Sequence, residues 1–228
     1  MHRHTLPRAA GVLAVLSAAL LAGGCSSGTT HARNGVDDAS PALPDFAAAA
    51  RLAEQAYAKE TAGRRDLSKG KTDSAEKKFN EAIDLYRQSI AESRSLPYVW
   101  NNLGVLYMES QNYIAAAEAF RNAADLDVND PRPLENLGTL YHRVGRDTEA
   151  LRYFSDALTR DPYWLPALRG TARCALRLPS GTGLSDEELL NRVERALMVE
   201  RDAQWRAVFE RAQVRLHGKL AATPSTRS

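Results

Sequence analysis

The chain has 228 residues, of which 44% are hydrophobic and 25% are charged. These proportions are ordinary for a globular protein, and the length suits one or two domains. The formal net charge is +2, so the composition as a whole offers no argument for a nucleic-acid-binding protein.

Residues 1–24 have the pattern of a secretory signal peptide. The segment MHRHTLPRAAGVLAVLSAALLAGG carries the basic residues Arg3 and Arg8, continues in an apolar run from Gly11 to Ala22 and ends in small residues. The apolar run is short for a bilayer-spanning helix, and polar sequence follows it directly. We therefore predict that residues 1–24 are removed and take no part in the fold.

The end of this segment, LLAGGC followed by two serines, resembles a bacterial lipobox, although Ala22 stands where the usual leucine would be. The resemblance implies cleavage before Cys25, lipidation of that cysteine and membrane attachment through its acyl chains. Ser26 resembles the residue that directs Gram-negative lipoproteins to the outer membrane, so we expect a lipid-anchored protein of the bacterial cell envelope. The alternatives are a plain secretion signal with a free thiol at Cys25 and an N-terminal anchor helix.

Processing also changes the charge and the cysteine count. Loss of Arg3 and Arg8 leaves 28 basic residues against 28 acidic ones. With Cys25 lipidated, Cys174 has no partner, which excludes a disulfide framework and favours a small core residue. Residues 25–44 are rich in Ser, Gly, Pro and Asp without an apolar period, so we predict a lipidated N-terminus and a flexible linker.

From Asp45 onward the sequence has helical patterns and an internal repeat. We find no segment with the period-two alternation of a strand. Shifting the chain so that Pro97 falls on Pro131 aligns at least nine identical pairs in one register without a gap. The pairs are Pro97/Pro131, Asn102/Asn136, Leu103/Leu137, Gly104/Gly138, Leu106/Leu140, Tyr107/Tyr141, Ala116/Ala150, Phe120/Phe154 and Ala123/Ala157.

This period and these residue types resemble the tetratricopeptide repeat family. The resemblance implies an all-α fold, a right-handed α-solenoid of antiparallel helix pairs with a C-terminal capping helix. We expect Gly104 and Gly138 to lie where two helices cross closely, and Phe120 and Phe154 to fill the space between them. The regular repeats would cover 97–130 and 131–164 of a solenoid that spans 45–218.

Less regular units flank these two repeats. Upstream, Gly70, Ala75, Phe79 and Ala82 have the repeat spacing, so we predict an irregular repeat over 45–96 with lengthened helices. Downstream we predict a degenerate repeat over 165–201, interrupted by the segment LPSGTG and resumed by a capping box from Ser185 to Glu188. A capping helix over 202–218 would pack through an apolar face and precede a disordered tail, 219–228. That face would hold Trp205, Val208, Phe209, Ala212 and Leu216.

The sequence contains no recognisable catalytic constellation. The mature chain has three histidines, His31, His142 and His217, none of which stands at ligand-like spacing from another His or Cys. We therefore expect no metal, no cofactor and no enzymatic activity. His142 precedes Arg143 at the edge of a polar turn, and we expect it to be solvated.

A binding groove is the better candidate for a functional site, because first helices line the concave surface in the family that this sequence resembles. Arg169, Arg173 and Arg177 follow an i, i+4, i+8 stripe, which predicts a basic C-terminal half of the groove. The competing interpretation is that this stripe is a solvated face and that the asparagines serve local helix packing. The candidate ligand-binding residues are Asn101, Asn102, Val105, Met108, Asn136, Arg143, Arg169 and Arg173.

These patterns predict a protein–protein interaction scaffold that receives a partner segment in its groove, and an acidic segment would suit the arginines. Assembly of a pilus, a secretion complex or a cell-wall complex would fit such a protein, but the fold does not choose among them. The alternatives are a structural lipoprotein that self-associates through its end helices, and an enzyme, which the missing constellation disfavours. We expect no nucleic-acid partner, and the oligomeric state is left open.

Overall fold

The computed structural model describes residues 45–179 and 183–222, which lie within one compact unit, Leu43–Ser228. The predicted signal peptide, the predicted lipidation site Cys25, the predicted linker up to residue 44 and residues 223–228 of the predicted tail lie outside the described residues. Within that part of the chain the fold is all-α, as predicted, and no strand occurs there.

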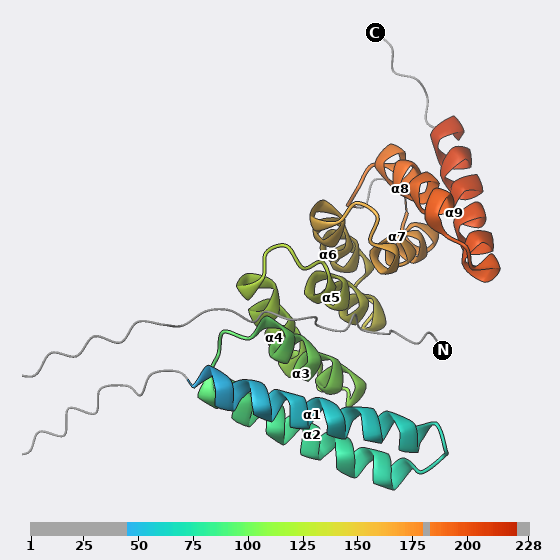
Figure 1. Cartoon of the computed structure of the whole chain (residues 1–228). Helices are drawn as coiled ribbons and strands as arrows, with labels where there is room; N and C mark the ends of the chain where they lie inside the picture. The colour runs from blue at the N-terminus through green and yellow to red at the C-terminus, as the bar shows by residue number, and fades with distance from the viewer. Residues whose placement is uncertain (1–44, 180–182, 223–228) are drawn as a thin grey trace, which may run out of the picture. The chain divides into compact units, whose positions relative to one another are not determined.

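The described helices follow one another with short connections (Figure 1). They are α1 (Phe46–Leu67), α2 (Thr72–Glu92), α3 (Pro97–Glu109), α4 (Tyr113–Leu126), α5 (Arg132–Arg143), α6 (Asp147–Arg160), α7 (Leu165–Arg177), α8 (Asp186–Val199) and α9 (Ala203–Ala222). The first two helices are the longest pair, in agreement with the lengthened first repeat that the sequence predicts.

The helices pack as successive pairs, α1–α2, α3–α4, α5–α6 and α7–α8. The second helix of each pair packs against the first helix of the next, so the pairs form a stack. The first helices also contact one another, α3 with α5 and α5 with α7, while α9 packs against both α7 and α8. The surface to which α3, α5 and α7 contribute is called the first-helix face below.

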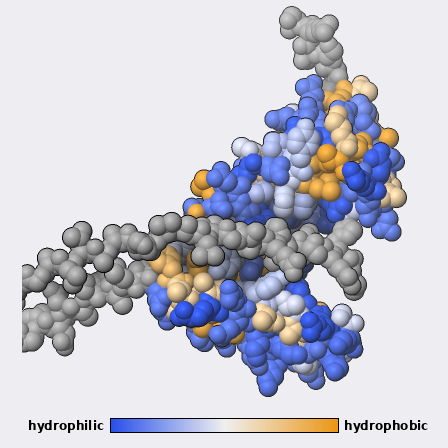
Figure 2. Space-filling view, in the orientation of Figure 1, coloured by the Kyte–Doolittle hydropathy of each residue, from blue (hydrophilic) through white to orange (hydrophobic). Residues whose placement is uncertain are grey.

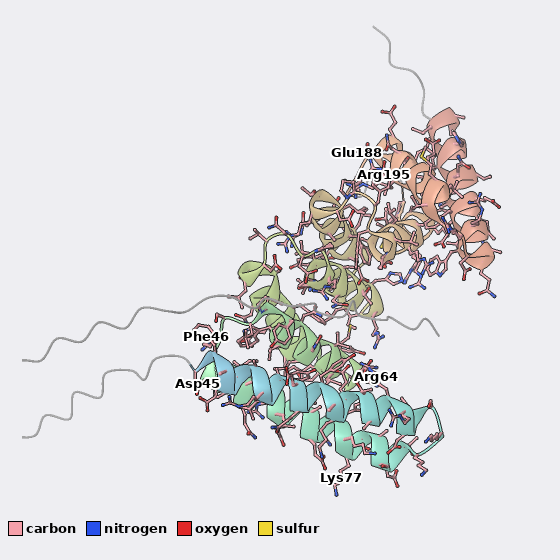
Figure 3. All side chains as sticks on the ribbon, in the orientation of Figure 1. Asp45, Phe46, Arg64, Lys77, Glu188 and Arg195 are labelled. Carbon is pink, nitrogen blue, oxygen red and sulfur yellow. The ribbon has the colours of Figure 1, made fainter. Side chains whose placement is uncertain are left out.

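Local sequence signals set the ends of these helices. The Asp45 side chain accepts a hydrogen bond from the backbone N–H of Ala48 at the start of α1 (Figure 3). The capping box predicted for α8 is confirmed: Glu188 N–H donates to the Ser185 hydroxyl, and Ser185 N–H donates to the Glu188 carboxylate. Such caps satisfy amide groups that have no partner in the first turn of a helix.

The tight turns within the two regular pairs fall at equivalent positions of the repeat. Gly145, between α5 and α6, has a φ of 80°. Gln111 is its counterpart one repeat earlier, between α3 and α4, and has a φ of 62°. Glycine adopts this left-handed conformation without the steric cost that a Cβ brings, so the α3–α4 turn is the more strained of the two.

Each regular pair is held together by a glycine that faces a phenylalanine. A Cβ added at Gly104 would lie 2.6 Å from the Phe120 ring, and one at Gly138 would lie 2.6 Å from the Phe154 ring. Both phenylalanines are fully buried. The predicted close helix crossing is therefore confirmed, and the contact is so tight that only glycine fits on the facing helix.

The same contact extends beyond the two regular repeats. Gly63 on α1 faces Phe79 on α2, where an added Cβ would come within 2.7 Å of the ring. Gly170 on α7 faces the outer edge of the Phe154 ring, where an added Cβ would lie only 2.3 Å from Cζ. Phe154 therefore lies between Gly138 of its own pair and Gly170 of the next.

The last helix is longer than predicted. It continues to Ala222, so residues 219–222, which we predicted as part of a disordered tail, are helical. The Lys219 ammonium donates to the Leu178 carbonyl at 3.1 Å and lies 3.5 Å from the Asp186 carboxylate. These two contacts hold the last turns of α9 against the connection between α7 and α8.

The apolar face predicted for α9 is confirmed. Phe209, Ala212 and Leu216 are fully buried, while Trp205 and Val208 pack against the same core and remain partly exposed. This core runs from the end of α3 to α9, and a smaller core joins α1, α2 and α3.

Replacing Gly170 by alanine should destabilise the protein by about 2 kcal/mol, because the new Cβ would overlap a ring that has no room to move. This loss should appear although alanine is the better helix former by about 1 kcal/mol. The matched control is Gly218→Ala, also within a helix, where an added Cβ meets nothing within 4 Å. We expect the control to raise the unfolding midpoint slightly; equal effects of the two variants in thermal unfolding would contradict the packing argument.

Candidate binding surface

The predicted groove residues come from three consecutive first helices. α3 carries Asn101, Val105 and Met108, α5 carries Asn136 and Arg143, and α7 carries Arg169 and Arg173. The structure therefore brings together side chains that are separated by about one or two repeats along the chain. They differ strongly in how accessible they are.

Two side-chain contacts link α3 to α5 across the first-helix face. The Asn136 amide donates to the Asn101 carboxamide oxygen at 2.9 Å, and an Arg143 guanidinium N–H reaches the Met108 carbonyl at 3.5 Å. Asn101 and Met108 are buried, whereas Val105 and Asn136 are half-buried and Arg143 is exposed. Val105, Asn136 and Arg143 are thus the residues of this part that a ligand can reach.

Asn102 faces a different part of the molecule. Its amide donates to the Tyr86 hydroxyl on α2 at 3.3 Å, and that hydroxyl donates to the Glu60 carboxylate at 3.1 Å. Tyr86 is fully buried, and burial, followed by the nearby Glu60 charge, raises the pKa of Tyr86. Asn102 therefore joins the first pair to the second, which agrees with the alternative that this asparagine serves helix packing.

The three arginines of the stripe on α7 have different partners within the protein. Arg169 forms two hydrogen bonds with the Glu200 carboxylate, 2.7 Å from Nε and 2.9 Å from a terminal nitrogen. Its guanidinium also lies 4.8 Å from the centre of the Trp205 ring of α9. Arg169 is 17% exposed and Glu200 2% exposed, so this pair fastens the connection between α8 and α9 to α7.

The electrostatics of Glu200 agree with that role. Burial by itself would raise its pKa, but hydrogen bonds from Arg169 and from the backbone N–H groups of Asp202 and Arg201 outweigh burial. The pKa of Glu200 is therefore lowered, and its carboxylate stays ionised beside Arg169.

Arg173 lies one turn further along α7 and is exposed. Its guanidinium stacks 4.6 Å from the centre of the Trp205 ring, on which Arg169 also lies. Aromatic stacking holds a guanidinium in place while leaving its N–H groups free to bind an anion. Among the described residues, neither Arg173 nor Arg143 forms an ion pair with a carboxylate within 4 Å.

One carboxylate lies on the same face. Glu135 on α5 accepts a hydrogen bond from the Thr139 hydroxyl at 2.8 Å. Burial raises the pKa of Glu135, although Thr139 and the charge of Arg173 act in the opposite direction. The first-helix face therefore carries the carboxylate of Glu135 as well as the guanidinium groups of Arg143 and Arg173.

His142 is not solvated, contrary to our expectation. Its Nδ1 lies 2.5 Å from Asp147 Oδ1, and only 19% of the His142 side chain and 8% of the Asp147 side chain are exposed. Arg177, the third arginine of the stripe, lies with its Nε 3.1 Å from the other oxygen of Asp147. Sequence analysis missed this cluster because Asp147 looks like an ordinary acid of a first helical turn.

Cys174 lies beside these residues and is fully buried with a free thiol, as predicted for a small core residue. Burial, together with the charge of Asp147, raises the pKa of Cys174 to about 12. The thiol is therefore protonated at neutral pH.

Two cavities are lined by none of the predicted groove residues. One of about 390 Å³ lies between α6 and α8, where Figure 3 labels Glu188 and Arg195. Another of about 570 Å³ is lined mainly by α1, α2 and α3 and includes Leu67, Phe79 and Leu106. Within residues 45–179 and 183–222, no helix combines the length and the apolarity needed to cross a membrane.

Comparison with known proteins identifies the repeats. A family model described as tetratricopeptide repeat matches residues 61–131 and 101–163. Tetratricopeptide repeat protein 28 of Mus musculus is 29% identical over 101 residues, which are 44% of this chain and 4% of that protein. Photosystem I assembly protein Ycf3 of Rippkaea orientalis is 24% identical over 110 residues, 44% of this chain and 62% of that protein.

Two further similarities are shorter or structural. Cellulose synthase operon protein C of Komagataeibacter xylinus is 42% identical over 62 residues, 25% of this chain and 5% of that protein. The crystal structure of MamA superimposes with a TM-score of 0.46 at 13% identity, covering 77% of this chain and 89% of that chain. The chain thus spans less than two thirds of each sequence relative named here.

Glu200→Gln should destabilise the protein by about 2 kcal/mol at pH 7, because it leaves Arg169 without its counter-charge. The folded pKa of Glu200 lies below its ordinary value of 4.5. The ionised Glu200 carboxylate therefore stabilises the folded protein fully above pH 4.5. This stabilisation is lost as the pH falls through the lowered pKa that Glu200 has in the folded state.

The measurement is the difference between the unfolding midpoints of wild type and variant at pH 7 and at pH 3. We expect this difference to shrink at the lower pH. The control, Glu210→Gln, changes an exposed glutamate on α9. A wild-type-to-variant difference that does not change with pH would contradict the proposed pair.

Proposed function

We propose that this chain, which contains tetratricopeptide repeats, is a non-catalytic adaptor that binds a segment of a partner protein on its first-helix face. Stacked repeats present extended surfaces of this kind, built from side chains of consecutive units. The observation that supports the proposal is the pair of exposed arginines, Arg143 and Arg173. Both lie on this face, and among the described residues neither forms an ion pair with a carboxylate within 4 Å.

The chemistry of the face suits an acidic partner segment. Arg173 is held by stacking on Trp205, so it would lose little conformational freedom on binding a carboxylate. Asn136 and Val105 lie on the same face and are half-buried. They would add a polar contact and an apolar contact to an extended or helical segment.

Arg169 does not contribute to this proposed site. Its guanidinium is already bound to Glu200 and is largely covered. A partner carboxylate would have to compete with two short hydrogen bonds and would leave Glu200 buried without its counter-charge. The proposed site therefore consists of Val105, Asn136, Arg143 and Arg173.

We further propose that the adaptor works in the bacterial cell envelope, fixed to a membrane by lipid on Cys25. The support is the lipobox-like segment before Cys25 and the polar linker after it, both of which lie outside the described residues. Assistance in assembling an envelope complex would be one use of such an adaptor. One relative named above is an assembly protein of photosystem I.

A second candidate function is self-association through the C-terminal helices. Met198 on α8 is 80% exposed and Val214 on α9 is 73% exposed. Figure 2 shows hydrophobic residues gathered over α8 and α9. A molar mass from light scattering that stays monomeric as concentration rises would rule this candidate out.

The partner can be found by photo-crosslinking in the cell. A crosslinking amino acid at Val105, on the first-helix face, should yield a discrete protein adduct. The control position for the crosslinking amino acid is Ile114, which is 85% exposed. It lies on α4, the second helix of its pair. Adducts at Ile114 without adducts at Val105 would place the binding surface elsewhere and contradict the proposal.

Once a partner is identified, Arg143→Glu combined with Arg173→Glu should weaken its binding at least about tenfold, because two attractive charges become repulsive. The control is Arg211→Glu combined with Arg215→Glu, which makes the same charge change at exposed positions of α9. Affinity is measured by calorimetry at fixed ionic strength. Equal losses in the two double variants would indicate a non-specific charge effect.

Cys25→Ser should move the protein from the membrane fraction to the soluble fraction after a salt wash, since it removes the lipid attachment site. The measurement is the distribution of the protein between the two fractions, with Cys174→Ser as a control that leaves Cys25 in place. Retention of Cys25→Ser in the washed membranes would show that lipid on this residue is not the anchor.

A further inference from the structure

Three potential metal ligands meet where α5, α6 and α7 come together. His142 is the last residue but one of α5, Asp147 is the first residue of α6, and Cys174 lies in the second half of α7. One ligand atom from each residue can be chosen so that all three lie within 4.8 Å of one another. They differ in chemical type: an imidazole nitrogen, a carboxylate oxygen and a thiol sulfur.

We propose that His142, Asp147 and Cys174 bind one Zn²⁺ ion, with a water molecule as the fourth ligand. Zinc accepts nitrogen, oxygen and sulfur ligands together, in a tetrahedral arrangement. A hard cation such as Mg²⁺ prefers oxygen ligands and would gain little from the sulfur and the imidazole. The donor set therefore favours zinc over the cations that carboxylate clusters attract.

The surroundings of Asp147 support such a site. The carboxylate binds His142 through Oδ1, while its Oδ2 lies 3.1 Å from Arg177 Nε. In metal sites, the ligating side chains are commonly oriented by hydrogen bonds or ion pairs with residues that do not themselves bind the metal. The Arg177 side chain is 55% exposed, so it can swing aside and admit an ion from solvent.

The three ligand atoms need small movements to hold the ion. Two ligands of a tetrahedral zinc with bonds of about 2.0 Å stand about 3.3 Å apart. The His142 Nδ1 to Asp147 Oδ1 distance of 2.5 Å must therefore lengthen, and Cys174 must approach the pair. His142 and Asp147 lie at the two ends of the α5–α6 turn, so rotations of their side chains would have to supply these movements.

Proton and charge balances are simple. The ion binds the lone pair of His142 Nδ1, so the imidazole proton resides on Nε2. The S–H bond of Cys174 breaks, a Zn–S bond forms, and the thiol proton passes to solvent. One thiolate and one carboxylate then balance the two positive charges of the ion, and the remaining charge of Arg177 lies on a side chain that is 55% exposed to solvent.

The site would tie the second regular repeat to the α7–α8 pair that follows it. Cys174 belongs to α7, whereas His142 and Asp147 belong to the preceding pair. Zinc would therefore stabilise this junction against local opening, next to Arg143 and Arg177. This proposal does not depend on the adaptor function, because it concerns the stability of the stack.

The test is direct metal binding by the full-length chain purified in detergent and stripped with a chelator. Addition of Co²⁺ should give the absorption of a thiolate–cobalt bond at one equivalent per chain. Zn²⁺ should abolish that absorption by displacing Co²⁺, and Mg²⁺ should not. Zn²⁺ should also raise the unfolding midpoint of the wild type.

Four variants locate the ligands. Cys174→Ala and His142→Ala should each lower zinc affinity about 100-fold or more, while Cys25→Ser and His217→Ala should bind as the wild type does. X-ray absorption at the zinc edge of the wild-type protein must show one sulfur in the first shell, and this measurement needs no variant to fold. Absence of that sulfur, or equal affinity in Cys174→Ala, would overturn the proposal.

Discussion

The contact between glycine and phenylalanine in each helix pair sets the geometry on which the rest of the structure depends. Phe154 illustrates it, because its buried ring is enclosed by Gly138 of its own pair and Gly170 of the next. With no side chain at either glycine, both facing helices approach the same ring at van der Waals distance. That approach fixes the separation of α5, α6 and α7, and hence the spacing of the side chains that α5 and α7 present.

Polar contacts also link each regular helix pair to its neighbour. The Arg160 guanidinium on α6 donates to the carbonyls of Ala124, Asp127 and Asp130, which close the end of α4 and the connection to α5. On the opposite side, Asn136 donates to Asn101. A cationic side chain bound to three partly buried backbone carbonyls and an amide pair between first helices hold consecutive repeats in register. The first-helix face is continuous as a result.

The periodicity of the sequence predicted much of this fold. It succeeded for features that depend on residues close together along the chain. The glycine–phenylalanine spacing, the capping box at Ser185 and the apolar face of α9 all follow from residues that lie close together in the sequence. Two outcomes depend on partners that are distant along the chain: the pairing of Arg169 with Glu200 and the meeting of Cys174 with Asp147. Helical spacing places a side chain on a face but does not say what lies opposite, so the candidate site could be located only in outline.

The three arginines of α7 show why the C-terminal repeat differs from the regular ones. Equal spacing gives them the same face of one helix, yet α9 supplies Trp205, which stacks on Arg169 and Arg173, and α6 supplies Asp147 to Arg177. A buried pair such as Arg169–Glu200 stabilises the stack only while both members are present. Arg169 therefore serves the stability of the stack. Arg173 is held by stacking on Trp205 alone, so its guanidinium N–H groups remain available to another molecule. The irregular α7–α8–α9 unit thus closes the core at this end. Of its two arginines that stack on Trp205, it leaves only Arg173 exposed for binding.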